Sequence, residues 1–223
     1  MDILERVRFE PPELGTVLAL SDKIPTGATI LDNSPYGNHG TITGATWVRL
    51  PSGLWVLSFD GTDDYINCGK TASLKITNTI TFECWVNPTS VVGDTQYFLG
   101  RVAGSYGNSL RILPTGVLRI YHYVLVTLEA YEDTTATITN GVWTHIRYVG
   151  NGASFAIYFN DIDAGAVQIA GTHSVKWNQD GNLWVGGYDG VPTKHFKGKI
   201  ALAKICPAVV SSHYQQEKHL FGV

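Results

Sequence analysis

The sequence contains few charged residues, a single methionine and only three cysteines in 223 residues. Charged residues make up 16% of the chain and the net charge is −3 with histidine neutral. A typical soluble domain carries about 25% charged residues. Without a basic stripe, the composition excludes the electrostatic surface that nucleic-acid binding requires. We therefore expect no nucleic-acid partner.

Long apolar runs are also missing. No segment approaches the roughly 18 apolar residues that span a membrane, and the opening MDILERVRFEPPELG has no apolar signal-peptide core. We therefore expect no membrane span and synthesis in the cytoplasm. Any action outside the cell is then expected to follow lysis or assembly into a larger particle.

The cysteines are Cys68, Cys84 and Cys206, an odd number whose spacing matches no zinc motif. Cys68 and Cys84 lie in alternating apolar patterns, where a free cysteine behaves as a small buried hydrophobic residue. A disulfide between these two stays open, because geometry decides it.

What the chain does contain is 24 glycines and many β-branched and aromatic residues in short runs. ITFECWV (80–86) alternates in the manner of a strand. The runs at 109–126, on either side of Pro-Thr-Gly, predict a hairpin, and those at 142–149 and 154–159 predict a second one. Asn160-Asp161 predicts a tight turn, because both residue types tolerate positive φ.

These runs recur about every 8–14 residues with no βαβ alternation, which predicts an all-β fold. We expect one two-sheet antiparallel β-sandwich of jelly-roll type over residues 14–223. Pro11-Pro12 predicts a boundary, so residues 1–13 are expected to form an N-terminal arm. Residues 211–221 predict a short C-terminal helix, with Ser212 and Gln215 as a capping box.

The segment LSFDGTDDYINCG (57–69) holds three carboxylates, those of Asp60, Asp63 and Asp64. Adjacent residues of a strand point to opposite faces, so Asp63 and Asp64 do not suit a catalytic pair. Gly61 supplies a turn between two alternating flanks. The segment is therefore predicted to be a strand, a turn and a strand.

Several runs occur together in a fixed order: LDNSPYGNHGTITGATWV, LSFDGTDDYINCG, ITFECWVNP, GVWTHIRYV, AIYFND, and LWVGGYDG followed by FKGKI. This series, from about residue 15 to 222, resembles the laminin-G-like domains of the concanavalin A-like lectin/glucanase superfamily. Where that family continues with Asp-Glu-Val, this chain has Ala201-Leu202-Ala203. The resemblance implies a concanavalin A-like jelly roll used for recognition, and it does not name a ligand.

The superfamily also includes glycosidases, whose retaining members need two carboxyl groups about 5–5.5 Å apart. In YHYVLVTLEAYED the candidates Glu129 and Asp133 are four residues apart, and no Glu-x-Asp-x-x-Glu signature is present. A nucleophile elbow is absent too. His122 and His145 lie in strand patterns and are interpreted as packed residues. We therefore expect no enzyme, with a glycoside hydrolase as the least favoured alternative.

Related domains often carry a structural Ca²⁺, which binds six to eight oxygen ligands. Loop acids and amides that suit it are Asp32, Asn33, Asp60, Asp63 and Asp189. The alternative is that each side chain hydrogen-bonds its own turn.

Sugars are bound by aromatic faces together with fixed polar groups. The candidate ligand-binding residues are Tyr106, Asn108, Tyr121, Tyr123, Trp177, Tyr188 and His195. The alternative for each aromatic residue is a place in the core or in a cross-strand pair. Four tryptophans are assigned to the core or to strand faces: Trp47, Trp55, Trp85 and Trp143.

The sequence thus favours a non-catalytic carbohydrate-binding, lectin-like module. The alternative is a structural or decoration subunit of a larger assembly, such as a virion surface, with the β-sandwich displayed outward. In that case the arm would dock on a neighbouring protein or mediate self-assembly.

Overall fold

The computed structural model describes residues 14–21, 25, 27–103, 106–124, 127–177, 180–187 and 194–223. It leaves out the side chains of residues 102–103, 106–107, 124 and 127–129. The predicted arm, residues 1–13, lies outside the described residues, so its docking role stays a prediction. Tyr188 and Asp189 lie outside them as well.

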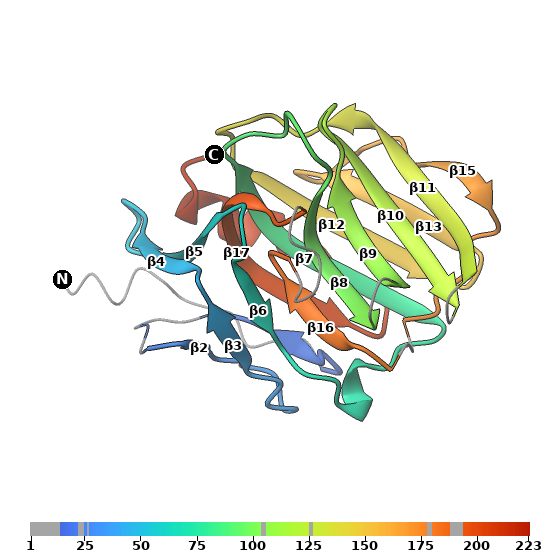
Figure 1. Cartoon of the computed structure of the whole chain (residues 1–223), viewed down its shortest axis with the longest axis horizontal. Coiled ribbons are helices and arrows are strands. Elements are labelled where there is room, and N and C mark those ends of the chain that lie inside the picture. The colour runs from blue at the N-terminus through green and yellow to red at the C-terminus, as the bar shows by residue number, and fades with distance from the viewer. Residues whose placement is uncertain are drawn as a thin grey trace.

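Two antiparallel sheets form the fold (Figure 1). The eight-stranded sheet has the order β14-β13-β12-β7-β17-β5-β4, with β1 also paired to β17. Its strands are β1 (Leu18–Ala19), β4 (Thr46–Arg49), β5 (Trp55–Asp60), β7 (Thr79–Pro88), β12 (Thr144–Asn151), β13 (Ser154–Phe159), β14 (Ile162–Asp163) and β17 (Lys197–Cys206).

The nine-stranded sheet has the order β15-β11-β10-β9-β8-β16-β6-β3-β2 and lies nearer to the viewer in Figure 1. Its strands are β2 (Thr29–Ile30), β3 (Gly40–Thr43), β6 (Tyr65–Asn67), β8 (Gln96–Ala103), β9 (Tyr106–Ile112), β10 (Val117–Val124), β11 (Thr127–Thr137), β15 (Val167–Gly171) and β16 (Asn182–Val185). The predicted all-β, two-sheet antiparallel sandwich is confirmed.

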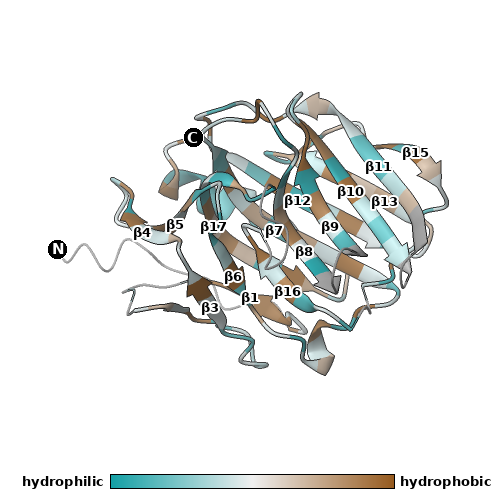
Figure 2. Ribbon diagram, in the orientation of Figure 1, coloured by the Kyte–Doolittle hydropathy of each residue, from teal (hydrophilic) through white to brown (hydrophobic). Residues whose placement is uncertain are grey.

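The main hydrophobic core lies between the sheets, because each strand turns alternate side chains inward. Figure 2 shows hydrophobic and hydrophilic residues alternating along the strands. Phe82 of β7 and Phe98 of β8 meet across this layer with ring centroids 6.2 Å apart. Leu118 and Ile120 of β10 are buried on the same inner face. The side chains on the outer face of the nine-stranded sheet therefore take no part in this core.

A second cluster lies on the outer face of the eight-stranded sheet. The C-terminal segment, containing α1 (Tyr214–Glu217) and η3 (Lys218–Leu220), packs there on Trp85. Trp85 stacks on Phe221 with centroids 4.1 Å apart and donates a 2.7 Å hydrogen bond to Glu217. The short helix is confirmed, but its predicted capping box is wrong: the N-cap is His213, without a side-chain cap. Ser212 instead accepts a hydrogen bond from the Tyr214 N–H.

The predicted hairpins are present. β9 pairs with β10, and β12 pairs with β13, both in antiparallel register. Asn160 and Asp161 turn the chain into β14 with φ of 53° and 67°, as the sequence indicated. A disulfide between Cys68 and Cys84 is not formed, because both thiols are free and buried. Within the described residues, no helix is long and apolar enough to cross a membrane.

Candidate functional site

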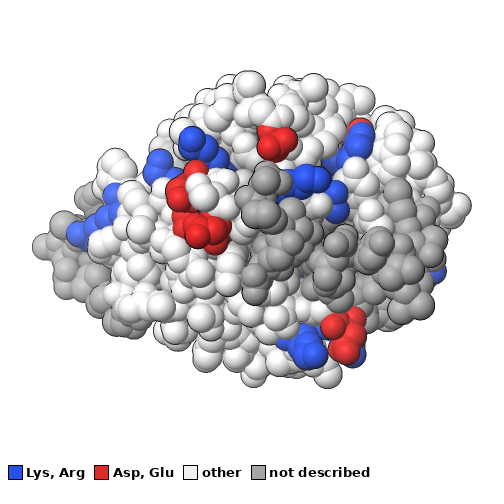
Figure 3. All heavy atoms as spheres, in the orientation of Figure 1, with Lys and Arg blue, Asp and Glu red and all other residues white. Residues whose placement is uncertain are grey.

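A row of aromatic and arginine side chains crosses the outer face of the nine-stranded sheet. It takes one residue from each of six neighbouring strands, and we call it the platform: Tyr131 (β11), Tyr121 (β10), Arg111 (β9), Tyr97 (β8), Trp184 (β16) and Tyr65 (β6). Strand pairing explains the alignment, because Tyr121 lies opposite Tyr131 and Arg111 lies opposite Tyr97. Figure 3 shows lysine or arginine side chains at the surface in the middle of this face.

Contacts between the members make the platform continuous. The guanidinium carbon of Arg111 lies 4.0 Å from the ring centroid of Tyr97 and 3.9 Å from that of Tyr121. Tyr121 and Tyr131 have centroids 5.5 Å apart. At the other end, Tyr65 meets Trp184 edge to face at 5.1 Å. Such cation–π and aromatic contacts hold planar groups in fixed orientations.

Arg119 fixes the β10–β11 end of the platform. It makes a bidentate ion pair with Asp133, with N–O distances of 2.5 and 2.6 Å. Its third nitrogen donates a 3.1 Å hydrogen bond to the Tyr121 hydroxyl. The hydrogen bond to Asp133 raises the pKa of Arg119 above its ordinary value, despite burial, so its charge is permanent. Tyr121 is thereby held in one orientation.

The platform is buried in its middle and half-buried at its two ends. Tyr121, Tyr123 and Tyr131 at one end and Tyr65 at the other are of intermediate exposure, whereas Tyr97 and Trp184 between them are only 7% and 8% exposed. Residues 194–196 lie beside the buried middle, where His195 forms a bridge to Tyr97. The part best placed to meet a ligand is therefore the end formed by β9, β10 and β11.

The predicted ligand-binding residues separate into two groups. Tyr121 and Tyr123 share this face with centroids 6.2 Å apart, and His195 lies 6.4 Å from the Tyr65 ring at the other end. His195 is itself buried. Tyr106 has only its backbone described, and Tyr188 lies outside the described residues.

Asn108 and Trp177 do not lie on this face. Asn108 is fully buried. Its side-chain amide donates a hydrogen bond to the Lys176 carbonyl and accepts one from the Tyr123 N–H. Trp177 is part of the main core, 1% exposed. Their side chains follow the inward alternation, so neither meets a ligand at the platform. Sequence reasoning missed six residues of the site: Tyr65, Tyr97, Arg111, Arg119, Tyr131 and Trp184.

The carboxylates of the predicted calcium site belong to two different turns. Asp32 is buried and accepts hydrogen bonds from the Ala19, Ser34 and Asn38 N–H groups. Asp60 accepts from the Thr62 N–H, and the buried Asp64 accepts from the Asp60 N–H. Burial raises the pKa of Asp64. Asp32, Asp60 and Asp64 thus hydrogen-bond the backbone of their own turns, and Asp32 also bonds the more distant Ala19.

Asp60, Asp63 and Asp64 do bring carboxylate oxygens within 4.8 Å of one another. Asp32 is not part of that group. The Asn33 side chain donates hydrogen bonds to Ser21. Calcium at Asp32, Asn33, Asp60, Asp63 and Asp189 stays a prediction, and an unchanged melting temperature in EDTA would argue against it.

The fold and these motifs have known relatives. A family model described as the concanavalin A-like lectin/glucanases superfamily matches residues 60–213. The chain belongs to this superfamily. No curated protein is detectably similar to it in sequence.

Solved structures share the concanavalin A-like fold at low identity. Domain 4 of AbnA, an extracellular arabinanase from Geobacillus stearothermophilus solved with arabinotriose, is 18% identical with a TM-score of 0.66, over 92% of this chain and 98% of that domain. The binding domain of Paraclostridial Mosquitocidal Protein 1 is 13% identical with a TM-score of 0.66, over 99% of this chain and 52% of that one.

A mutant Trypanosoma rangeli sialidase displaying trans-sialidase activity is 13% identical with a TM-score of 0.66, over 96% of this chain. This concanavalin A-like chain spans 34% of the sialidase and about half of the mosquitocidal binding domain. These likenesses show the fold alone.

Proposed function

We propose that this domain is a non-catalytic carbohydrate-binding module that binds a glycan along the end of the platform formed by β9, β10 and β11. The observation that carries the proposal is the fixed pair formed by Tyr121 and Tyr131, flanked by Arg111 and Arg119. A ligand site combines apolar or aromatic surface with a few positioned polar groups. Aromatic faces suit the C–H faces of a sugar ring, and guanidinium groups donate hydrogen bonds to its hydroxyls.

Preorganisation supports this assignment. Arg119 is held by Asp133 and by Tyr121 before any ligand arrives, so little side-chain entropy is lost on binding. Domain 4 of AbnA was solved with arabinotriose, and the chain matches nearly the whole of that domain. That match makes arabino-oligosaccharides the first ligands to test.

The environment of Asp133 supports a role without catalysis. Retaining glycosidases need two reacting carboxyl groups about 5–5.5 Å apart, and Asp133 is engaged by both nitrogens of Arg119. A carboxylate held in this way is a positioning group and a poor general acid.

The test is a glycan array followed by calorimetry with the best oligosaccharide, in calcium and in EDTA. Tyr121→Ala is expected to weaken binding about 30-fold, the effect of losing a central contact of about 2 kcal/mol. The matched control is Tyr158→Ala, which removes a half-buried tyrosine stacked 5.0 Å from Arg147 on the other sheet. This control is expected to bind normally.

Two results would overturn the proposal. The first is the absence of any glycan bound above background on the array. The second is equal affinity of the Tyr121→Ala and wild-type proteins for a glycan that is bound.

A further inference from the structure

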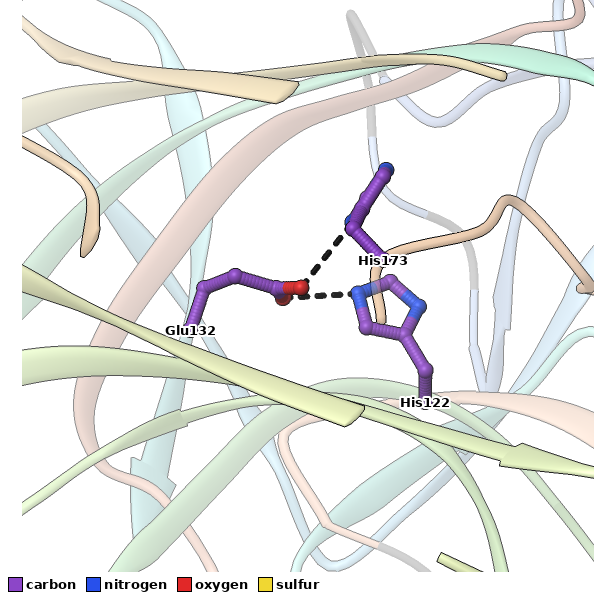
Figure 4. Close-up of side chains that lie close together, drawn as sticks. All are labelled: His122, Glu132 and His173. Carbon is purple, nitrogen blue, oxygen red and sulfur yellow. Dashed lines mark hydrogen bonds and ion pairs between the residues drawn. The ribbon is translucent and has the colours of Figure 1, made fainter. Parts of the chain in front are cut away.

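Two histidines and a glutamate meet in the interior, between the two sheets (Figure 4). His122 comes from β10, Glu132 from β11, and His173 from the segment that follows β15. Their side chains are 1%, 0% and 1% exposed. His122 shares the inward face with Ile120, and Glu132 lies directly opposite Ile120 in the strand register. The cluster therefore lies on the opposite face of the strands that carry Tyr121 and Tyr131 of the platform.

The three side chains converge on one point. His122 Nε2 lies 2.8 Å from one Glu132 oxygen, and His173 Nδ1 lies 3.0 Å from the other. The two imidazole rings are nearly perpendicular, with centroids 4.8 Å apart. All three ligand atoms lie within 4.8 Å of one another.

The cluster lies in an apolar layer. The Glu132 side chain is fully buried, and its two oxygens are bonded to His122 and His173. Phe155 packs on the His173 ring at 4.8 Å. Burying an ion costs several kcal/mol unless it is compensated.

Hydrogen bonding within the cluster does not satisfy all of its polar atoms. His122 Nδ1, His173 Nε2 and the Tyr148 hydroxyl are buried without a hydrogen-bond partner in the described part of the chain. Tyr148 reaches in from β12, its ring 6.5 Å from His122 and 6.4 Å from His173. Buried polar networks in proteins are usually closed. The two open nitrogens are those that do not face Glu132, so His122 Nε2 and His173 Nδ1 are the nitrogens placed to bind an ion beside the carboxylate.

We propose that His122, Glu132 and His173 bind one Zn²⁺ ion. Two imidazole nitrogens and one carboxylate are a known zinc ligand set, with metal–ligand distances of about 2.0–2.2 Å. Ligand atoms around such a tetrahedral ion are about 3.3 Å apart, close to the 2.8 and 3.0 Å separations present. Small side-chain rotations therefore admit the ion, which replaces the shared protons and balances the carboxylate charge.

The ligand types also select the metal. Ca²⁺ takes six to eight oxygen ligands, whereas imidazole favours zinc and its transition-metal neighbours. The bound ion ties β10 and β11 to the segment that carries His173, which makes the site structural.

The test begins with protein unfolded in guanidinium with a chelator, desalted, and refolded with or without one equivalent of ZnCl₂. A second arm adds ZnCl₂ to the folded protein, because the site is closed to solvent. After desalting, mass spectrometry of the metal is expected to find one zinc per chain. At a hundredfold excess over Kd, Tm is expected to rise by about 5–10 °C.

Glu132→Gln is expected to abolish zinc retention. The matched control is His213→Ala, which removes the imidazole bonded to another buried glutamate, Glu83, and is expected to retain zinc. Glu132→Gln alters a buried group and can therefore disturb the fold. A second measurement uses the wild-type protein, in which the fold is unchanged. Zinc is expected to shift the imidazole ¹⁵N resonances of His122 and His173 and to leave those of His213 unchanged.

Cobalt substitution separates this site from the cysteines. Bound Co²⁺ is expected to show four-coordinate ligand-field bands without thiolate-to-metal charge transfer. The proposal is overturned if neither loading arm retains zinc, if Glu132→Gln and His213→Ala retain it equally, or if thiolate charge transfer accompanies binding.

Discussion

Replacing Glu83 by alanine is expected to lower the free energy of unfolding by about 3–5 kcal/mol. Glu83 lies on β7 with its side chain 3% exposed, beneath the C-terminal segment. It accepts a 2.5 Å hydrogen bond from the His213 ring and a 3.3 Å bond from the His213 N–H. Arg147 and His145 lie 3.7 and 3.9 Å away.

The magnitude follows from what remains after the carboxylate is removed. Arg147 and His213 would keep their positions with no buried anion beside them, and breaking one partner of a buried ion pair typically costs this amount. The C-terminal segment would also lose its bonds to β7. For a domain of this size, the expected fall in Tm is about 6–20 °C.

The assay is urea unfolding followed by tryptophan fluorescence and circular dichroism. The control is Asp180→Ala, which breaks an exposed pair with Lys75 at 3.4 Å and is expected to cost less than about 1 kcal/mol. Equal losses in the two variants, or a loss below about 1 kcal/mol for Glu83→Ala, would refute the reasoning.

Three further predictions concern the same protein. Acidification from pH 7 to 4 is expected to destabilise it. Burial lowers the pKa of His145. Burial alone would raise the pKa of Glu83, but the His213 hydrogen bond and the nearby basic side chains together lower it. Both groups therefore bind protons more readily in the unfolded chain than in the folded protein. Stability falls as the pH drops below the pKa values of the unfolded chain, about 6.5 for His145 and about 4.3 for Glu83. A urea midpoint independent of pH would contradict this prediction. Phe221→Ala is expected to lower the free energy of unfolding by about 3–4 kcal/mol, because the Phe221 ring centroid lies 4.1 Å from that of Trp85 and 4.7 Å from that of Trp143. The control Val223→Ala is expected to have little effect. Melting of the two variants is compared by calorimetry. Thiol reagents are expected to label none of the three cysteines in the native protein and all three after unfolding. The reason is that all three thiols are buried, and burial raises the pKa of Cys68 and Cys84. Rapid labelling of the native protein would contradict this prediction and show that the core opens.

Local features were readable from the sequence because short segments decide them. Asn160 and Asp161 accept positive φ, and the alternation of β10 and β12 fixes which side chains turn inward. The turn at LSFDGTDDYINCG is likewise local, held by Asp60 and Asp64 within five positions. The alternation, turn and motif evidence together were enough for the fold.

The candidate sites were less readable because they combine distant strands. Tyr121 and Tyr123 were identified, since they share one strand face, but their neighbours Arg111 and Tyr131 join them only through strand pairing. Trp177 was misplaced because an isolated aromatic residue in a loop-like run carries no sign of its burial. The role of 1–13 and the assembly alternative remain predictions.

The sequence by itself determined the all-β class, the hairpins, the turn at Asp60 and membership of the concanavalin A-like superfamily, since each depends on neighbouring residues or on motif order. Tertiary structure decided which distant residues meet. It aligned Tyr65, on β6, with Tyr131, on β11, along one row, and it brought His173 to Glu132, 41 positions away in the chain. Strand order and sheet packing determine such contacts, and neither leaves a periodic signal along the chain.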